Sequence, residues 1–554
     1  MPLIDDDFKD ATDDSTEQTT SHLPAPAPIE TSHILPNSIQ PTINSAFESQ
    51  TPYDVRHPRK VMLDKLVLDL CVRDMQPLSV VEDIGFRTLV NALDKRYTIV
   101  ARKTLRDSLL PRVYKERKSA LFLDLSAVDH VGITTDQWTS RANEGYTTVT
   151  CHFTRDDWTL ASPVLATRSS GARHSGENMA DELAEIFTEF GITNKVTSIV
   201  TDNAKNAKKA VRITEKDNQP CFAHTLNLIV THSLEDDESA ASDIHDVKQI
   251  ALFFKQSVQA TRELKKVHEK NGSTFKKIKN DVKTRWNSTF IMLQSYLPQH
   301  KEVKAVLCLL DKTDLVIKDV AIARLKKTMA TLEPFFLATE ELSCEKHTSI
   351  SKVLTLIKML NGSTAHQTDQ LSTLLHKYCH LYLGASEDRP LLRQASYLDP
   401  RYKDYPFTSK TTLDRTINEI RSRLMMTKGE EKRTEDSQPT PPPPKKTNAL
   451  WQLFDEDNTV SIIEATPEAV INTELQLYSD AQRLNRRADP LQWWKKQSLR
   501  LPNLAQLAKE LLAVPATSVP SERVFSKAGE LISAKRSRLG KETVDRILFL
   551  NKYK

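Results

Sequence analysis

The stretch from residue 130 to 235 constrains the fold most, because it combines short β-branched runs with one helical pattern. Apolar residues recur at intervals of three and four over 179–190, which predicts an amphipathic helix. Short β-branched runs predict buried strands. The expected strands are 130–136, 146–153, 158–167 and 196–201. The order β-β-β-α-β predicts an α/β layer with a mixed sheet.

The sequence on both sides of this stretch has helical or polar character. Apolar residues follow helical spacing over 60–128, and about 240–425 is almost wholly helical in pattern. Residues 427–447 are polar and proline-rich, which predicts a surface linker or loop. Further helices are expected around 503–513 and 542–550. We therefore divide the chain into 1–58, 60–128, 129–235, 236–470 and 471–554.

The first region has the composition of a disordered tail. Residues 1–58 are rich in Pro, Ser, Thr and Asp, and have almost no apolar periodicity. Such a segment buries too little apolar surface to offset its ordering entropy. Residues 1–50 hold nine acidic side chains and one basic one, whereas the whole chain has a formal charge of +4. The remainder is therefore basic, which tolerates a polyanionic partner without proving one.

Cysteine spacing and hydropathy exclude several classes of protein. The six cysteines lie far apart and form no Cys-x-x-Cys pair, so we expect neither a disulfide scaffold nor a cysteine-rich zinc finger. No apolar run approaches the roughly 18–20 residues that a membrane span needs. The acidic N-terminus does not resemble a signal peptide. We expect an intracellular, soluble protein with no membrane partner.

Two acidic residues stand at the carboxyl ends of expected strands. They are Asp136 in TTDQWTS and Asp202 in VTDNAKN. Functional groups commonly occupy this end of a strand in open α/β sheets. Carboxylates on neighbouring strands suit Mg²⁺, and paired metal ions can activate the attacking oxygen and stabilise the leaving one in phosphodiester chemistry. Alternatively, each aspartate only caps a turn or the following helix.

Six sequence motifs occur in a fixed order along the chain. They are TTDQWTS, TDNAKN, CFAHTLNL, TRWNSTF, SYLDPRYK and the block from DPLQWW to SERVFSKAGELISAKRSRL. This series resembles the hAT (hobo–Activator type) DNA transposase superfamily, especially its BED-zinc-finger-protein branch. The resemblance covers about residues 60–554, which is nearly everything except the tail.

The resemblance implies an RNase H-like core with a mixed sheet, interrupted by a large all-α insertion. It also implies a DDE catalytic triad of Asp136, Asp202 and Glu522, which would hold Mg²⁺ or Mn²⁺. The expected insertion lies between Asp202 and Glu522, which are 320 residues apart by subtraction. Independently, Ser518 and Pro520 are helix-start signals that place Glu522 in a first turn. The alternative for Glu522 is a helix-start acid favoured by the macrodipole.

Cys221 and His224 match the Cys-x-x-His motif that the family has near its active site. This spacing is half of a zinc site, but no second pair lies within reach along the sequence, so we expect no structural zinc in this chain. We expect His224 to contact DNA or to position the catalytic aspartate. We expect Cys221 to be packed.

Arg285 and Trp286 in TRWNS resemble the insertion-domain position where the family stacks a flipped base during hairpin formation. An indole offers a large face to an extruded base, and arginine can hold the adjoining phosphate. The alternative is a buried core tryptophan beside a surface arginine. The sequence leaves both readings open.

The C-terminal part resembles the hAT dimerisation region, which implies a homo-oligomer. The tryptophan pair at 493–494 and the apolar faces of 503–513 and 542–550 suit burial against neighbouring helices or a second subunit. A small basic cluster that could touch phosphates, or form a solvated face, lies at Lys535, Arg536 and Arg538.

One departure from the family pattern keeps two functions open. Relatives of this branch begin with a BED zinc finger, whereas residues 1–60 contain no cysteine. We therefore expect the site-specific DNA reader to be absent from this chain or omitted from its gene model. The first function is metal-dependent DNA cleavage, hairpin formation and transfer. The second is a catalytically silent nuclear factor that dimerises and regulates transcription. Both imply DNA as a partner and a nuclear location.

Overall fold

The computed structural model describes residues 51–139, 143–170, 175–282, 285–343, 347–365, 369–435, 466–532 and 539–552. The described residues fall into two units. The first unit contains 51–117 and 526–551, and the second contains 118–525 and 552. The expected tail up to residue 50, the proline-rich stretch from 436 to 447, and the cluster of Lys535, Arg536 and Arg538 lie outside the described residues.

The regular elements in the described residues of the first unit are all helical. Its elements are α2 (Pro58–Arg73), η1 (Leu78–Glu82), α3 (Ile84–Leu93), α4 (Arg102–Thr104), η2 (Leu105–Leu109), the start of α5 (Leu110–Ser126), the end of α22 (Val519–Leu531) and α23 (Lys541–Lys552). Proline at the first helical position suits the start of α2, because its missing N–H would be unpaired there. The Asn551 amide donates to the Val72 carbonyl at 2.8 Å. That bond joins the last helix to the first.

The second unit contains a mixed sheet of six strands in its described residues. The strands are β1 (Val131–Thr139), β2 (Gly145–Thr154), β3 (Leu160–Ala161), β4 (Val164–Ser170), β5 (Val196–Thr201) and β6 (Asp217–Pro220). Their order is β3-β2-β1-β5-β6, and β4 also pairs with β2. The pairs of β2 are antiparallel, whereas β1–β5 and β5–β6 are parallel. The expected mixed α/β arrangement is therefore confirmed.

Two strand boundaries differ from the sequence-based expectation. The run expected as one strand at 158–167 forms two strands, because Pro163 has no N–H to donate to a ladder. The Pro163 carbonyl still accepts from Cys151 N at 2.9 Å, where the register of β2 shifts. Strand β6 was not expected, because its sequence Asp-Asn-Gln-Pro has no β-branched residue.

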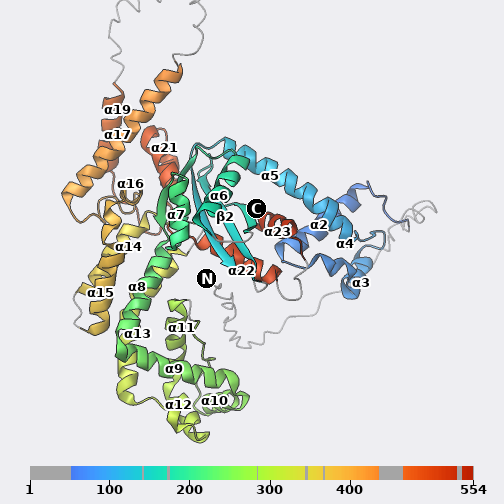
Figure 1. Cartoon of the computed structure of the whole chain (residues 1–554), viewed down its shortest axis with the longest axis vertical. Coiled ribbons are helices and arrows are strands. Elements are labelled where there is room, and N and C mark those ends of the chain that lie inside the picture. Colours follow the sequence, from blue (N-terminus) through green and yellow to red (C-terminus); the bar gives the residue numbers. More distant parts are fainter. Residues whose placement is uncertain are drawn as a thin grey trace, which may run out of the picture. The chain divides into compact units, whose positions relative to one another are not determined.

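Two neighbouring helices pack on the sheet, one against β4 and the other against β5 and β6. Helix α6 (Gly176–Glu189) begins where the Ser175 hydroxyl accepts from Asn178 N, and it is followed by Gly191 in the left-handed region at φ 65°. Helix α7 (Lys205–Ile213) follows β5 directly. Figure 1 shows α6 and α7 side by side next to the sheet.

The regular elements described between β6 and α20 are all helical. They are α8 (Phe222–Asp236), α9 (Glu238–Gln256), α10 (Val258–Lys270), α11 (Trp286–Tyr296), η3 (Leu297–Gln299), α12 (His300–Leu309), η4 (Thr313–Leu315), α13 (Asp319–Leu342), α14 (Lys352–Ala365), α15 (Gln370–Leu383), η5 (Gly384–Asp388), α16 (Pro390–Tyr397), α17 (Lys410–Glu435) and α19 (Pro467–Asp480). Helices α9 to α12 share one apolar cluster with the start of α13. A second, larger cluster joins α8, α13 and α14 to the C-terminal helices.

The expected linker at 427–447 is wrong in its first part. Helix α17 continues through Glu435, so residues 427–435 are helical. These residues are mostly Lys, Glu and Arg, which are good helix formers, and proline first appears at position 439. A prediction based on polarity alone therefore ended helix α17 too early.

The tryptophan pair lies in α20 (Pro490–Gln497), which joins the large cluster together with α21 (Pro502–Leu511). Trp494 is fully buried, and its indole Nε1 donates to the Leu398 carbonyl at 2.8 Å. Tyr478 stacks on it, with ring centroids 5.1 Å apart. Among the described residues, no helix has the length and apolar character to span a bilayer.

Candidate active site

The register of the parallel pair β1–β5 places two aspartates at one edge of the sheet. Thr134 of β1 pairs with Val200 of β5. Asp136 lies two residues further along β1, and Asp202 directly follows the end of β5, so both lie at the same edge of the sheet. Such strands are about 4.8 Å apart. The sheet therefore brings together the two carboxylates that the sequence singled out.

Backbone amides fix the orientation of both carboxylates. The Asp136 Oδ1 atom accepts from Gln137 N at 2.8 Å, and the Asp202 Oδ1 atom accepts from Ala204 N at 3.1 Å. Asp202 thus caps the turn before α7, which was the alternative to metal binding in the sequence analysis. Both aspartates also line a cavity of about 260 Å³, with Asn206 and Trp138 among its other walls. Both aspartates therefore border the cavity, although the Asp202 side chain also caps a turn.

Glu522 joins this pair from the far end of the chain. It lies in the first turn of α22, and its backbone N–H donates to the Ser518 carbonyl. Burial raises the pKa of Asp136 well above its ordinary value, and the negative charges of Glu522 and Asp202 raise it further. The three carboxylates therefore form one electrostatic group.

Side chains from α8 and from the residue before α11 act on the charge of Glu522. Burial raises the pKa of Glu522, whereas Arg285, His224 and Arg523 lower it. Burial also lowers the pKa of the Arg285 guanidinium, against the opposing effect of Glu522. His224 and Arg285 thus lie in the same electrostatic group as the acids.

Cys221 is a packed residue that links α8 to the segment before α22. Its side chain is fully buried, and its sulfur accepts from His224 N at 3.5 Å and from Ser518 N at 3.3 Å. Burial and the charge of Glu522 raise the pKa of its thiol to about 11. Phe222 N also donates to the Ala516 carbonyl at 3.0 Å. These bonds hold His224 and Glu522 in one neighbourhood.

Trp286 is a core residue in this structure. Only 5% of its surface is exposed, and its ring meets Phe290 and Phe336 edge-on at 6.5 and 6.4 Å. Its indole N–H is buried without a hydrogen-bond partner. The structure thus favours the core alternative for Trp286 in this conformation. Base stacking would require the ring to leave the core, and that role stays a prediction.

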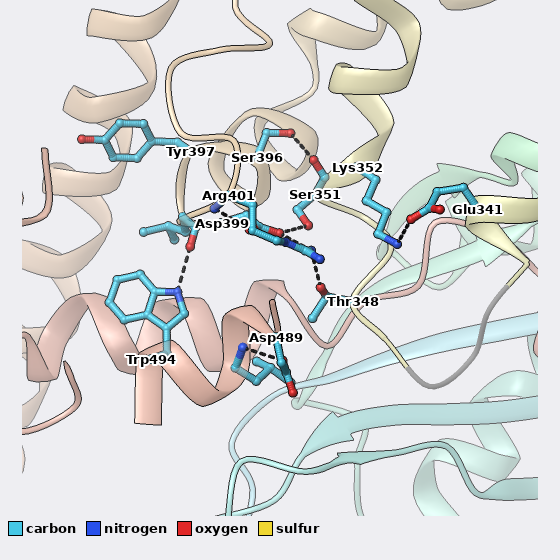
Figure 2. Close-up of polar contacts among 12 residues, drawn as sticks. Glu341, Thr348, Ser351, Lys352, Ser396, Tyr397, Asp399, Arg401, Asp489 and Trp494 are labelled. Carbon is cyan, nitrogen blue, oxygen red and sulfur yellow. Dashed lines mark hydrogen bonds and ion pairs between the residues drawn. The ribbon is translucent and has the colours of Figure 1, made fainter. Parts of the chain in front are cut away.

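Sequence reasoning missed the structural role of the SYLDPRYK motif. The Asp399 carboxylate is fully buried and accepts from the Arg401 guanidinium at 2.6 and 2.9 Å. The Ser351 hydroxyl donates to Asp399 at 2.6 Å, and Arg401 donates to the Thr348 hydroxyl at 2.9 Å. Figure 2 shows Arg401 between Asp399 and Thr348. Asp399 and Arg401 therefore form a buried ion pair whose polar atoms have further hydrogen-bond partners.

The segment that binds this ion pair also binds the loop before α22. Ser349 lies between Thr348 and Ser351, and its hydroxyl accepts from Ala516 N at 3.0 Å. Ala516 is six residues before Glu522. The Asp399–Arg401 pair therefore anchors a segment that holds the approach to α22. The signal in the sequence was an acid and an arginine two residues apart in the SYLDPRYK motif.

The carboxylates of Asp136 and Asp202 have the chemistry to bind a hard divalent cation. Mg²⁺ is commonly bound through one or two carboxylates, several waters and substrate phosphates. Asp136 and Asp202 supply such a pair, and their open side is the cavity. Within the described ranges, no three acidic, histidine or cysteine side chains are grouped closely enough to hold a metal ion by themselves. The site thus fits Mg²⁺ as a carboxylate pair.

Comparison with known families covers the three segments that build the site. Residues 134–220 match the ZBED1 RNase-like domain, 219–332 match the ZBED1 RNase-like helical domain, and 474–553 match the hAT family C-terminal dimerisation region. Asp136 and Asp202 lie in the first segment and Glu522 in the third.

Through these matches the chain resembles the hAT transposases and the BED zinc finger proteins.

Relatives of this chain include transposases and BED proteins. The chain is 25% identical to human "Zinc finger BED domain-containing protein 4", covering 89% of this chain and 44% of the relative. It is 26% identical to "Putative AC transposase" of Zea mays, covering 90% and 65%. It is 24% identical to "Putative transcriptional regulator tpeD" of Talaromyces stipitatus, covering 90% and 62%. The chain thus spans between 44% and 65% of the length of these relatives.

Proposed function

We propose that this chain is a hAT-type DNA transposase whose second unit cleaves DNA strands. One contact carries the proposal: the Ser521 hydroxyl, next to Glu522, lies 2.6 Å from the Thr134 hydroxyl, two residues before Asp136. The negative charges of Glu522 and Asp202 also raise the pKa of Asp136. The mixed sheet and the matched RNase-like segment support an RNase H-like core. Asp136, Asp202 and Glu522 would then act as its DDE triad.

The chain's own residues would divide the work of binding and orientation. Asp136 and Asp202 would hold Mg²⁺ or Mn²⁺, with Glu522 as the third carboxylate. The cation would polarise the scissile phosphate and make an attacking oxygen more nucleophilic. Arg285 and His224, which act on the charge of Glu522, would hold the DNA phosphate beside the carboxylates. Burial of the acids would keep bulk water away from this contact.

The family also implies a setting for this activity. The matched C-terminal dimerisation region supports self-association of the chain. The names of relatives, transposase and transcriptional regulator, support DNA as a partner and the nucleus as its location. Sedimentation of the purified chain over a range of concentrations tests the self-association, and a monomer throughout would contradict it.

A second candidate is a catalytically silent nuclear factor that dimerises and regulates transcription. Two observations favour it: a relative named as a putative transcriptional regulator, and the lack of a preformed three-ligand metal cluster in the described residues. In that case the carboxylates persist as buried acids and the dimerisation region carries the function.

A nicking assay separates the two candidates. The full chain is fused to a foreign sequence-specific DNA-binding domain, so that failure to find DNA is not mistaken for failure of chemistry. Supercoiled plasmid with the foreign site is incubated with Mg²⁺ or with Mn²⁺. The transposase proposal expects relaxed product in at least one metal. Folded fusion protein that cuts in neither metal overturns it and leaves the regulator.

A further inference from the structure

Helix α7 presents a stripe of four cations beside the candidate active site. Lys205, Lys208, Lys209 and Arg212 are all exposed. They follow the spacing i, i+3, i+4 and i+7, which places them along one side of a helix. The residues Ala207, Ala210 and Val211 are buried on the other side. We call the four cations the α7 stripe.

The α7 stripe is poorly compensated by acids of the protein. Lys209 forms an ion pair with Glu177 of α6. Throughout the described part of the chain, Lys205, Lys208 and Arg212 form no ion pair, and α7 itself contains no acidic residue. Like charges at these spacings destabilise a helix. A stripe of this kind gains most from an external polyanion.

The α7 stripe lies on the solvent side of its helix, next to the candidate active site. Helix α7 begins three residues after Asp202, and Asn206 and Ala207 of its first turns line the cavity. Lys205 and Arg212 are separated by about 10 Å along the axis at 1.5 Å per residue. That length corresponds to roughly three base pairs of B-DNA at 3.4 Å each.

We propose that the α7 stripe is a phosphate-contact surface that holds the DNA backbone on the solvent side of α7, beside the candidate active site. This inference rests on the proposed function, because it says where DNA would bind beside the same site. Lys205, Lys208 and Arg212 contact successive phosphates, and they carry no sequence preference. Asn206 donates to the Gln137 side chain at 3.3 Å, which ties the start of α7 to β1.

The salt dependence of duplex binding tests this surface without any cleavage. Affinity for an unrelated 20-base-pair duplex is measured in EDTA over a range of KCl concentrations. The magnitude of the slope of log affinity against log salt is about 0.9 for each phosphate that the protein neutralises. The triple variant Lys205→Gln, Lys208→Gln, Arg212→Gln neutralises three fewer phosphates, so its slope is expected to be smaller by about 2.7.

A matched triple variant controls for net charge. Arg262, Lys301 and Lys312 are exposed cations of the helical insertion, and their triple change to Gln removes the same charge. The control is expected to keep the parental slope, and Lys205→Arg with Lys208→Arg is expected to keep it too. An unchanged slope in the α7 variant, or equal reductions in both triples, overturns the inference. A reduced slope confined to the α7 variant, together with a parent that does not nick DNA, would instead overturn the proposed cleavage alone.

Discussion

The Ser521 hydroxyl lies 2.6 Å from the Thr134 hydroxyl, although 387 residues separate them in the chain. Thr134 precedes Asp136 by two residues on β1, and Ser521 directly precedes Glu522. Thr134 also contacts the Thr150 hydroxyl, so buried polar groups join two antiparallel strands to α22. This contact sets where the first turn of α22 meets the sheet. It therefore determines how Glu522 lies relative to Asp136.

Replacing Thr134 with Val should loosen that contact. The change keeps the side-chain shape but leaves the Ser521 hydroxyl without this partner, and an unpaired buried polar group costs about 1–3 kcal/mol. Urea unfolding should show a loss of stability in that range. Thr159→Val, at an exposed turn, is the control and should cost less. Equal losses in the two variants would contradict the role of the Thr134–Ser521 contact.

Asp202→Asn should abolish nicking by the fused protein. A neutral amide cannot supply the charge that holds a cation beside the phosphodiester, and loss of one preorganised electrostatic group typically costs on the order of 10²–10³ in rate. Gel quantification of relaxed plasmid measures the effect. Asp217→Asn changes an exposed acid at the start of β6 and should retain activity. Full activity of Asp202→Asn would remove it from the triad.

Glu522→Gln should stabilise the metal-free protein at neutral pH. The pKa of Glu522 is raised in the folded state, because burial outweighs the attraction of Arg285 and His224. Between the ordinary value of 4.5 and the raised value, the folded state binds more protons than the unfolded state, so stability falls as pH rises. Above the raised pKa, the ionised Glu522 carboxylate destabilises the folded protein by an amount that no longer changes with pH.

Thermal melting in EDTA at several pH values checks this sign. The Glu522→Gln variant should melt above the parent at pH 7, and its advantage should shrink as the pH falls toward 4.5. Glu185→Gln removes a carboxylate whose side chain is 72% exposed, and it should leave the pH profile unchanged. A lower melting temperature for Glu522→Gln at neutral pH would show that its cations dominate.

Arg401→Met should strongly destabilise the second unit. Removing one partner leaves Asp399 buried with an uncompensated charge, which costs about 3–5 kcal/mol. Arg483→Met breaks a half-exposed pair with Asp404 and should cost less than about 1 kcal/mol. Adding Asp399→Leu to Arg401→Met should recover part of the stability. Denaturant unfolding compares the two single variants and the double variant. A small loss of stability for Arg401→Met would contradict the anchoring role of the Asp399–Arg401 pair.

Trp286→Ala should destabilise the protein by about 3–5 kcal/mol, because it empties a buried aromatic site. Trp286→Phe keeps most of the volume and should cost clearly less. Denaturant unfolding measures both. A loss below about 1 kcal/mol for Trp286→Ala, far under the usual cost of emptying such a site, would mean that the ring is exposed in solution and free to stack on a base. Trp286→Phe is therefore the variant in which hairpin formation can be assayed on a folded protein.

The local part of the site could be predicted from sequence because strand ends have local signals. Asp136 and Asp202 follow β-branched runs, and the parallel pairing of β1 and β5 then places them together. Glu522 could be assigned only through family resemblance. Nothing in its helix pattern specifies that Ser521 meets Thr134, since that contact depends on packing across hundreds of residues.

Other features escaped because their signals are weak or ambiguous. Trp286 has the same sequence context whether its ring is buried or presented to a base, and only its neighbours Phe290 and Phe336 decide. Helix α17 passed the expected break because charged residues are compatible with both loops and helices. The Asp399–Arg401 pair is visible in sequence as two charges, but its burial is a tertiary property.

The distance along the chain between Thr134 and Ser521 also has a consequence in time. At roughly 5–20 residues per second, a ribosome needs roughly 20–80 s to travel from one to the other. During that interval β1 and β2 have been made, but the hydroxyl and carboxylate that complete their edge have not. A shortened product that ends between residues 221 and 521 therefore contains the strands and both aspartates without the completed site. Cells would make the scaffold early and the carboxylate group only at the end of translation.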